Sequence, residues 1–421
     1  METDGSWPIV WEKARGTQVW DADGKRYLDL TAAFGVAAAG HANPRVVKAG
    51  QSQMRHLLHA MGDVHPHELK AVLARELSRL TFGRWSRASK GRSSGCGKVG
   101  KTIFCNSGFE AVEAALKTAI LATGKPGVLV FEGAYHGLGY GTLNATHRHH
   151  FRLPFRAQLA EFGRFVAFPG TLEPLAATEA AVHKSFKRND IGAILVEPIQ
   201  ARGGIRVPPA GFLPFLRRLC DEHKSVLILD EIYTGFGRTG RWFACEHAGV
   251  APDLVCLGKA LTGGFPLSAC VGRAELMDQA WPKSAGEAIH TSTFLGHPVG
   301  CAMGMAQIAE IRRGGLVGQS HRLGNKLLAA LKEVAGPPGL ALEARGCGLM
   351  AGLELRLPDG TPATEVCLRI VKQMLHAGVI LLPEGEHSNV IAFTPPLTIS
   401  DSELARTVRM LQQAILRGRA T

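Results

Sequence analysis

VLILD at residues 226–230 and LVCLGK at residues 254–259 are the two stretches that decide the fold. Each is a short apolar run that ends in a polar side chain, Asp230 in the first and Lys259 in the second. Strands that are apolar on both faces are typical of a parallel sheet covered by helices on both sides. Because ligands of such sheets bind beyond the carboxyl ends of the strands, Asp230 and Lys259 are the first candidates for a functional site.

The same pattern recurs along the middle of the chain. Further apolar runs lie at 102–105, 127–131, 191–196 and 267–271, and helix-like stretches separate several of them, at 107–123 and 211–223. This alternation predicts an α/β fold, with a large domain built on a mostly parallel central sheet that carries helices on both faces.

After Gly300 the pattern changes, which predicts a smaller C-terminal α+β domain. Helix-like stretches at 301–313 and 317–334 precede short strands around 348–354 and 389–393 and a closing helix at 401–416. Near the N-terminus, strands at 17–20 and 25–28 are joined by the turn Asp23-Gly24. We therefore expect an N-terminal segment at 1–60 that packs with the small domain, a large domain at 61–299 and the small domain at 300–421.

Composition narrows the class of protein. Of the 421 residues 46% are hydrophobic and 20% are charged, as in globular proteins, and no apolar run has the length of a membrane span. Residues 1–8 lack the apolar core of a secretory signal. The nine cysteines have neither framework nor zinc spacing, which favours free thiols in a cytoplasmic protein without a metal site.

The charge balance is basic, with 48 Lys and Arg against 36 Asp and Glu, for a net charge of +12. Much of the excess lies at 84–101, which we interpret as a solvated surface loop, and at 148–156. A basic protein could bind nucleic acid or small anions such as phosphates and carboxylates. Since no nucleic-acid-binding module is present, we expect small-molecule partners and neither nucleic acid nor a membrane.

Three polar residues follow apolar runs and are expected at one edge of the sheet: Asp230, Lys259 and Glu197, which comes directly after 191–196. Lys259 stands in the glycine-flanked stretch GKALTGG at 258–264. Lysine is rarely buried without a partner, and burial favours its neutral, nucleophilic form. Asp230 taken alone could equally be a turn residue. Together, the two groups supply what pyridoxal phosphate needs, an amine that forms a Schiff base and a carboxylate that keeps the pyridine protonated.

A phosphate site is predicted at 106–110, the stretch NSGFE between a strand and a helix. Ser107 and Glu110 have the spacing of a capping box, and Gly108 lets a ligand approach the backbone. A capped helix without a ligand has the same signature. Tyr135, in the stretch YHG at 135–137, adds a ring that could stack on a cofactor.

These residues, in this order, resemble the class III aminotransferases, the group of fold-type I pyridoxal-phosphate enzymes that includes 4-aminobutyrate, ornithine and acetylornithine aminotransferases. The resemblance runs from VWDADGKRYLD at 19–29 to PPLT at 395–398. Its core is LDEI at 229–232, GFGRTG at 235–240, Pro252-Asp253 and Gly258-Lys259.

The resemblance implies roles for particular residues. Lys259 would hold the cofactor as a Schiff base and move a proton between substrate and cofactor, and Asp230 would pair with the ring nitrogen. Thr293 would reach the phosphate of the neighbouring subunit, so that a homodimer shares its active sites. The remaining cofactor and substrate contacts would come from Ser107, Gly108, Phe109, Tyr135, His136 and Ile232 around the cofactor, and from Glu197 and Gln200 in the substrate pocket.

One departure from the family bears on the substrate. Family members usually carry an arginine about two residues before the Pro-Pro-Leu-Thr segment, and Ala392 fills that place in the substrate pocket here. Either the donor lacks a carboxylate at that point, or another arginine binds it. Arg148, Arg152, Arg156 and Arg202 are the candidates. Without an arginine opposite it, Glu197 could instead receive a cationic donor such as a diamine. Tyr233 and His297 are smaller departures, at positions often filled by glutamine and asparagine.

GCGKVGKT at 95–102 matches the P-loop of nucleotide-binding proteins residue for residue. A P-loop follows an apolar strand and opens a helix, whereas the preceding residues are polar and 102–105 is a predicted strand, so we reject this function. Racemases or epimerases, aminomutases and decarboxylases of the same fold remain alternatives. The sequence favours a cytoplasmic, homodimeric aminotransferase that moves an amino group from a primary amine, an ω-amino acid or a diamine, to a 2-oxo acid.

Overall fold

The computed structural model describes residues 9–62, 64–88, 99–170, 174–283 and 286–417. Its centre is a seven-stranded sheet with the order β4-β10-β9-β8-β7-β5-β6. The strands are β4 (Gly100–Cys105), β10 (Ser268–Arg273), β9 (Leu254–Leu257), β8 (Val226–Asp230), β7 (Ile191–Val196), β5 (Gly127–Phe131) and β6 (Gly163–Val166). The strand β10 runs antiparallel to β4 and β9, and every other pairing in the sheet is parallel, which confirms the predicted mostly parallel sheet.

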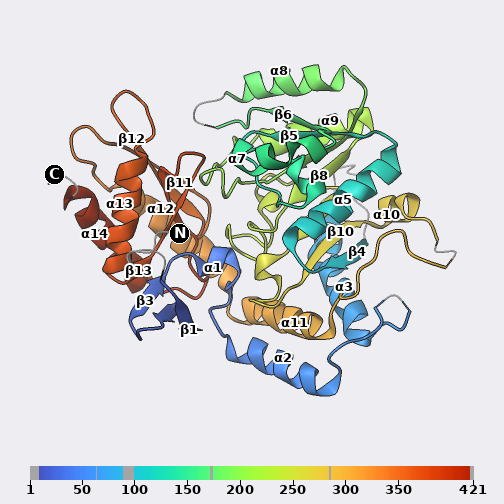
Figure 1. Ribbon diagram of the computed structural model, residues 1–421, viewed down its shortest axis with the longest axis horizontal. Helices are drawn as coiled ribbons and strands as arrows, with labels where there is room; N and C mark the ends of the chain where they lie inside the picture. The colour runs from blue at the N-terminus through green and yellow to red at the C-terminus, as the bar shows by residue number, and fades with distance from the viewer. Residues whose placement is uncertain (1–8, 63, 89–98, 171–173, 284–285, 418–421) are drawn as a thin grey trace.

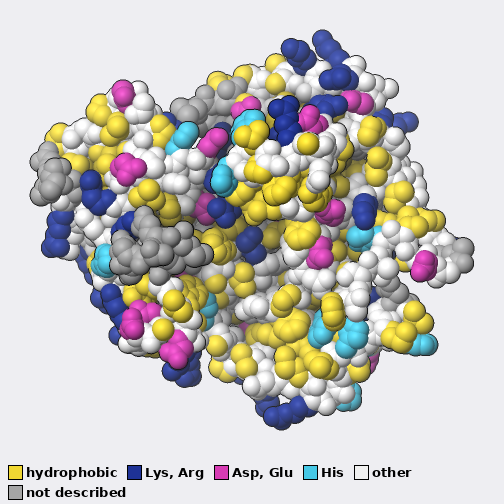
Figure 2. Space-filling model, in the orientation of Figure 1, with side chains coloured by type: hydrophobic (Ala, Val, Ile, Leu, Met, Phe, Trp, Pro, Cys, Tyr) yellow, Lys and Arg dark blue, Asp and Glu magenta, His cyan; other side chains and the backbone are white. Residues whose placement is uncertain are grey.

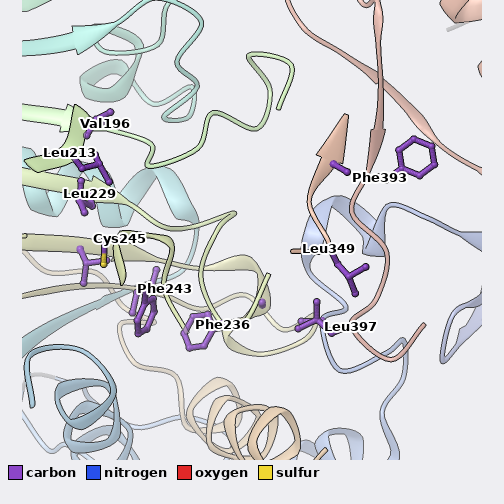
Figure 3. Close-up of a cluster of buried hydrophobic side chains, with 14 of the residues drawn as sticks. Val196, Leu213, Leu229, Phe236, Phe243, Cys245, Leu349, Phe393 and Leu397 are labelled. Atoms are coloured by element: carbon purple, nitrogen blue, oxygen red, sulfur yellow. The ribbon is translucent and has the colours of Figure 1, made fainter. Parts of the chain in front are cut away.

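Helices cover both faces of this sheet, as expected from strands that are apolar on both sides. Alternate residues of β8 face opposite ways: Leu227 and Leu229 join one buried cluster, and Val226 and Ile228 join the other. Figure 3 shows Leu229 beside Val196 and Leu213 in the first cluster. Each fully buried leucine contributes about 2 kcal/mol of burial free energy, so this packing fixes the strand ends that carry the polar residues.

The covering helices divide between the two clusters. Those in the first cluster are α3 (Glu68–Leu80), α8 (Leu175–Phe186) and α9 (Phe212–His223), and those in the second are α5 (Gly108–Thr123) and α10 (Ala274–Ala280). Short helical segments complete this part of the chain: α1 (Ala32–Gly35), α4 (Phe82–Ala88), α6 (Tyr140–Leu143), α7 (His149–Arg152), η1 (Leu153–Gln158), η2 (Ala244–His247) and η3 (Lys259–Leu261).

The C-terminal part forms a second layer of sheet and helices, at the left of Figure 1. Its sheet has the order β11-β12-β15-β14, from β11 (Ala341–Gly346), β12 (Ala351–Arg356), β15 (Val390–Phe393) and β14 (Leu382–Glu384). The helices of this part are α12 (Leu316–Lys332), α13 (Thr364–His376) and α14 (Asp401–Arg417). The strands and helices agree with the predicted α+β pattern after Gly300.

The N-terminal strands belong to a separate sheet with the order β1-β2-β3-β13, from β1 (Trp11–Arg15), β2 (Gln18–Asp21), β3 (Arg26–Asp29) and β13 (Val379–Ile380). The pairing of β3 with β13 joins the start of the chain to its C-terminal part. By contrast, α2 (Pro44–His56) packs along α11 (Pro298–Arg313), as the lower part of Figure 1 shows. The division at residues 60 and 299 therefore stays a prediction.

The basic stretch at 84–101 is not a loop throughout. Its first residues are helical in α4, because Trp85 is buried against Phe82 and Phe243. Gly95 to Lys98 of the P-loop-like motif lie outside the described residues, and Thr102 lies within β4 rather than at the start of a helix. Among the described helices, none combines the length and the apolar composition of a membrane span.

Candidate active site

A cavity of about 310 Å³ opens at the carboxyl ends of β7, β8 and β9. The register of the sheet explains why: Val196 pairs with Leu229, and Asp230 with Cys256, so the residues that follow these strands meet at one edge. The cavity is lined by Gly108, Phe109, Tyr135, His136, Gly137, Leu138, Glu197, Ala201, Arg202, Asp230, Ile232, Tyr233 and Lys259. The fold thus brings together most of the residues predicted from sequence.

Lys259 begins the turn η3 directly after Gly258, with a φ of 31° in the left-handed region that non-glycine residues avoid. Its amine lies 4.6 Å from the centre of the Tyr233 ring. Burial lowers the pKa of Lys259, and the nearby carboxylates of Asp230 and Glu197 oppose that shift. The result is an amine closer to its neutral, nucleophilic form than a surface lysine would be.

The carboxylate of Asp230 is buried and held from two sides. One oxygen lies 2.8 Å from His136 Nδ1, and the other accepts a hydrogen bond from the Ile232 backbone N–H at 3.1 Å. His136 Nε2 is buried without a hydrogen-bond partner among the described residues. A carboxylate so fixed in an open cavity fits a protonated ring nitrogen, as pyridoxal phosphate would present.

The start of α5 fits an anion. Glu110 accepts hydrogen bonds from the Ser107 N–H and hydroxyl and from the Asn106 N–H, which confirms the predicted capping box and fixes the first turn. The N–H groups of Gly108 and Phe109 donate to no group in the described chain, and both residues line the cavity. Free amides at the N-terminus of a long helix suit a phosphate group.

Glycine is required where this helix meets the next loop. Gly137 has a φ of 104°, and a Cβ atom there would lie 2.3 Å from the Cβ of Phe109. The bare backbone at this position lets the loop from β5 close over the start of α5. The residues present therefore fit pyridoxal phosphate at both its ring and its phosphate.

Glu197 is fully buried beside the cavity. Its two oxygens accept hydrogen bonds from the backbone N–H groups of Tyr135 at 3.0 Å and Ala201 at 3.1 Å. Burial raises the pKa of Glu197 to about 7, Asp230 adds to this rise, and His136 and the two hydrogen bonds oppose it. The side chain can therefore be neutral or charged at physiological pH.

Arg202 is the only arginine among the described residues that line the cavity. Its guanidinium lies over the Tyr135 ring, 5.1 Å from the centre, and 3.7 Å from an oxygen of Glu384. Glu384 is buried, and its burial raises its pKa against the effects of Arg202, Arg148 and Lys259. No sequence pattern marks Glu384, because it meets Arg202 only through the folding of β14.

Some predicted residues do not line the cavity. Gln200 is buried and donates to the Glu132 carbonyl, and Ala392 lies in an apolar cluster with Ile205 and Met350. Ser107 caps the helix behind the lining residues. Thr293 is exposed in the segment before α11. The substrate-pocket roles of Gln200 and Ala392 and the phosphate role of Thr293 stay predictions. No group of three metal-ligating side chains is found in the described residues.

Comparisons with known proteins agree with this geometry. The family model described as Aminotransferase class-III matches residues 2–415. The chain is 36% identical to the 5-aminovalerate aminotransferase of Pseudomonas aeruginosa, covering 96% of this chain and 93% of that protein. It is also 36% identical to the putrescine aminotransferase of Pectobacterium atrosepticum, over 97% and 83%. A PLP-bound amine transaminase from an uncultivated Pseudomonas species superposes with a TM-score of 0.85 at 28% identity, over 99% and 97%.

Proposed function

Because the chain belongs to the class III aminotransferases, we propose that its cavity binds pyridoxal phosphate through Lys259 and Asp230 and accepts an amine with its amino group at the end of a carbon chain. The protein is a pyridoxal-phosphate-dependent aminotransferase that moves an amino group from a primary amine to a 2-oxo acid. The racemase, aminomutase and decarboxylase alternatives are not favoured by these relatives.

Three groups of the cavity would bind different parts of the cofactor. The amine of Lys259 would hold the cofactor covalently, the carboxylate of Asp230 would pair with its ring nitrogen, and the free N–H groups at the start of α5 would bind its phosphate. When bound, the cofactor withdraws electrons from the substrate carbon that carries the amino group. Ile232 packs against the backbone of Gly108, where a Cβ atom would lie only 3.1 Å from Ile232 Cδ1. The two residues together form one wall of the cavity.

Lys259 is proposed to transfer the proton between substrate and cofactor. The depressed pKa of Lys259 suits an amine that accepts a proton from the substrate carbon and returns it to another atom. His136 holds the Asp230 carboxylate in a fixed orientation at 2.8 Å, so that its negative charge would be available to the protonated ring nitrogen of the cofactor. The ring of Tyr233 packs below the Lys259 amine and limits its movement.

The proposed donors are ω-amino acids or diamines, by analogy with the relatives named for 5-aminovalerate and putrescine. The placement of Lys259 and Asp230 in one cavity is the observation that carries the assignment. The test is the visible absorbance of the protein with pyridoxal phosphate, followed as amines are added one at a time and a 2-oxo acid afterwards. Bleaching by ω-amines and recovery with the 2-oxo acid are expected.

Lys259→Ala should lose covalent retention of the cofactor and at least about 100-fold in turnover, the lower range for a residue that transfers protons. Lys101→Ala is the matched control, since Lys101 is exposed and pairs with Asp278 away from the cavity. If Lys259→Ala binds the cofactor and turns over like the control, the assignment of Lys259 is wrong.

The active form is proposed to be a cytoplasmic homodimer. Exposed apolar side chains follow the middle of α2 and recur in the segment before α11: Met54, Leu57, Leu58, Met61, Val64, Ile289 and Phe294. Figure 2 shows hydrophobic and histidine side chains together over this lower part of the molecule. Such a patch suits an interface with a second copy, and it includes the neighbourhood of Thr293.

The described cysteines are all free, although Cys256 and Cys270 are register partners on β9 and β10, which suits a reducing compartment.

A further inference from the structure

The guanidinium of Arg202 is available to a ligand. It lines the same cavity as Lys259, a third of its side chain is exposed, and its face lies over the ring of Tyr135. Its side chain makes no hydrogen bond to any described residue, and its Nε is buried without a partner. A guanidinium carries five donors, and none of those of Arg202 is used in a hydrogen bond within the described residues.

The ion pair that Arg202 does make is loose. Its Nε lies 3.7 Å from Glu384 Oε2, and that oxygen is also buried without a hydrogen-bond partner. Two other arginine–glutamate pairs each form two short hydrogen bonds: Arg313 with Glu310 at 3.0 and 2.7 Å, and Arg79 with Glu76 at 2.9 Å twice. The Arg202–Glu384 pair beside the cavity therefore neutralises charge without fixing the Arg202 guanidinium in one position.

The backbone fixes the two members of this pair beside each other. The Arg202 carbonyl accepts hydrogen bonds from the Gly385 N–H at 3.2 Å and from the Arg148 guanidinium at 2.5 Å, and Arg148 also donates to the Gly385 carbonyl at 2.7 Å. The position of the guanidinium can thus change by side-chain rotation while its main chain stays anchored to the turn after Glu384.

The other arginine candidates are engaged elsewhere. Arg148 is used in the backbone contacts just described, Arg152 lies over the Phe165 ring at 4.9 Å, and Arg156 pairs with Glu161 at the surface. The position of Ala392 is closed by apolar neighbours rather than open to the cavity.

We propose that Arg202 binds the distal carboxylate of an ω-amino acid donor and that Glu384 is the counter-ion that Arg202 releases when the carboxylate arrives. This inference rests on the proposed aminotransferase function and narrows its donors: an ω-amino acid is preferred, and a diamine is disfavoured because Arg202 repels its second ammonium group. Arg202 and Glu384 then select the substrate, while Lys259 and Asp230 carry out the chemistry.

The test uses the cofactor-loaded enzyme and the donor half-reaction alone, so that recognition of the acceptor does not enter. Three donors of equal chain length are compared by the rate of absorbance loss at rising concentration: 5-aminovalerate, pentylamine and 1,5-diaminopentane. The wild type should prefer 5-aminovalerate over pentylamine by about 10- to 100-fold in second-order rate constant, the factor expected for a charge-assisted, bidentate contact.

Arg202→Gln should remove this preference by slowing 5-aminovalerate and leaving pentylamine within about threefold, and it should improve 1,5-diaminopentane. Glu384→Gln should strengthen the preference, because the carboxylate no longer competes with a buried counter-ion. Arg84→Gln, which breaks an exposed pair with Glu246 far from the cavity, is the matched control and should change none of the ratios.

The outcomes separate the inference from the function on which it rests. If Arg202→Gln slows both monoamines equally, or changes neither, Arg202 does not bind the carboxylate. A Glu384→Gln variant with an unchanged preference overturns the counter-ion role. If the wild type retains the cofactor but reacts with none of the three donors or any other amine, the proposed function itself fails and the inference falls with it.

Discussion

Replacing Glu197 by glutamine should change how the stability of the cofactor-free protein depends on pH. The carboxyl group is fully buried, and burial raises its pKa from 4.5 to about 7. The unfolded chain releases this proton near pH 4.5, whereas the folded protein keeps it until about pH 7. Between these values the folded state binds more protons, so the free energy of unfolding falls as the pH rises.

The raised pKa of Glu197 determines how much the free energy of unfolding changes with pH. A rise from 4.5 to about 7 costs about 3 kcal/mol once Glu197 is charged, at about 1.4 kcal/mol for each pKa unit. About 2.5 kcal/mol of this loss should fall between pH 5 and pH 8. A chain of 421 residues unfolds with an entropy of about 0.9 kcal/mol per kelvin, so the loss corresponds to a change of about 3 °C in Tm.

The assay is thermal unfolding of the cofactor-free wild type and Glu197→Gln at pH 5 and pH 8. Glutamine loses one of the two backbone hydrogen bonds at every pH, because its amide nitrogen cannot accept one, but it also removes the charge. The difference in Tm between variant and wild type should therefore rise by about 3 °C in favour of the variant from pH 5 to pH 8. Glu12→Gln, at an exposed position on β1, is the control and should follow the wild type. Parallel behaviour of Glu197→Gln and the wild type, within about 1 °C, would refute the argument that burial keeps Glu197 protonated.

Two further changes test packing, one beside the site and one in the C-terminal part of the chain. Tyr233→Phe removes the 3.2 Å hydrogen bond between the Tyr233 hydroxyl and Thr394 Oγ1, and calorimetry should show Tm lower by about 1 °C, as for a loss of about 1 kcal/mol. Gly324→Ala places a Cβ atom 2.1 Å from the backbone of Gly348, and because neither backbone can yield, the soluble yield should fall sharply. Gly318→Ala on the same helix meets nothing within 4 Å and should instead raise Tm slightly; equal yields for the two variants would contradict the predicted clash.

The sequence predicted the central sheet well because burial on both faces leaves a continuous apolar run. β7 begins and ends where the run at 191–196 does, and β9 matches the run at 254–257. The strand β6 was missed, since it lies at the edge of the sheet and its residues, GRFV, include only one fully buried side chain. An edge strand has no apolar partner on one side and so leaves no continuous signal.

The residues of the candidate site also differ in how well the sequence predicts them. Lys259, Asp230 and Glu197 follow buried strands directly, so the sheet alone brings them together. Arg202 is one of four arginines among which the sequence does not choose, and no sequence pattern marks Glu384. Only the approach of the turn after β14 to the Arg202 carbonyl pairs them, and no local pattern encodes that contact.

The residues proposed to select the donor are held less firmly than the residues proposed to bind the cofactor. Asp230 is fixed by a buried histidine and by the backbone of its own strand end, and Lys259 by a strained turn, so neither can move without disturbing the sheet. Arg202 stands on a turn and Glu384 at the end of the short strand β14, and their ion pair lacks hydrogen bonds. A substitution at either one would alter the charge beside the cavity without breaking a hydrogen bond of the cofactor site, although loss of Arg202 leaves the buried Glu384 without its counter-ion. Donor choice can therefore change through this pair while the cofactor site keeps its geometry.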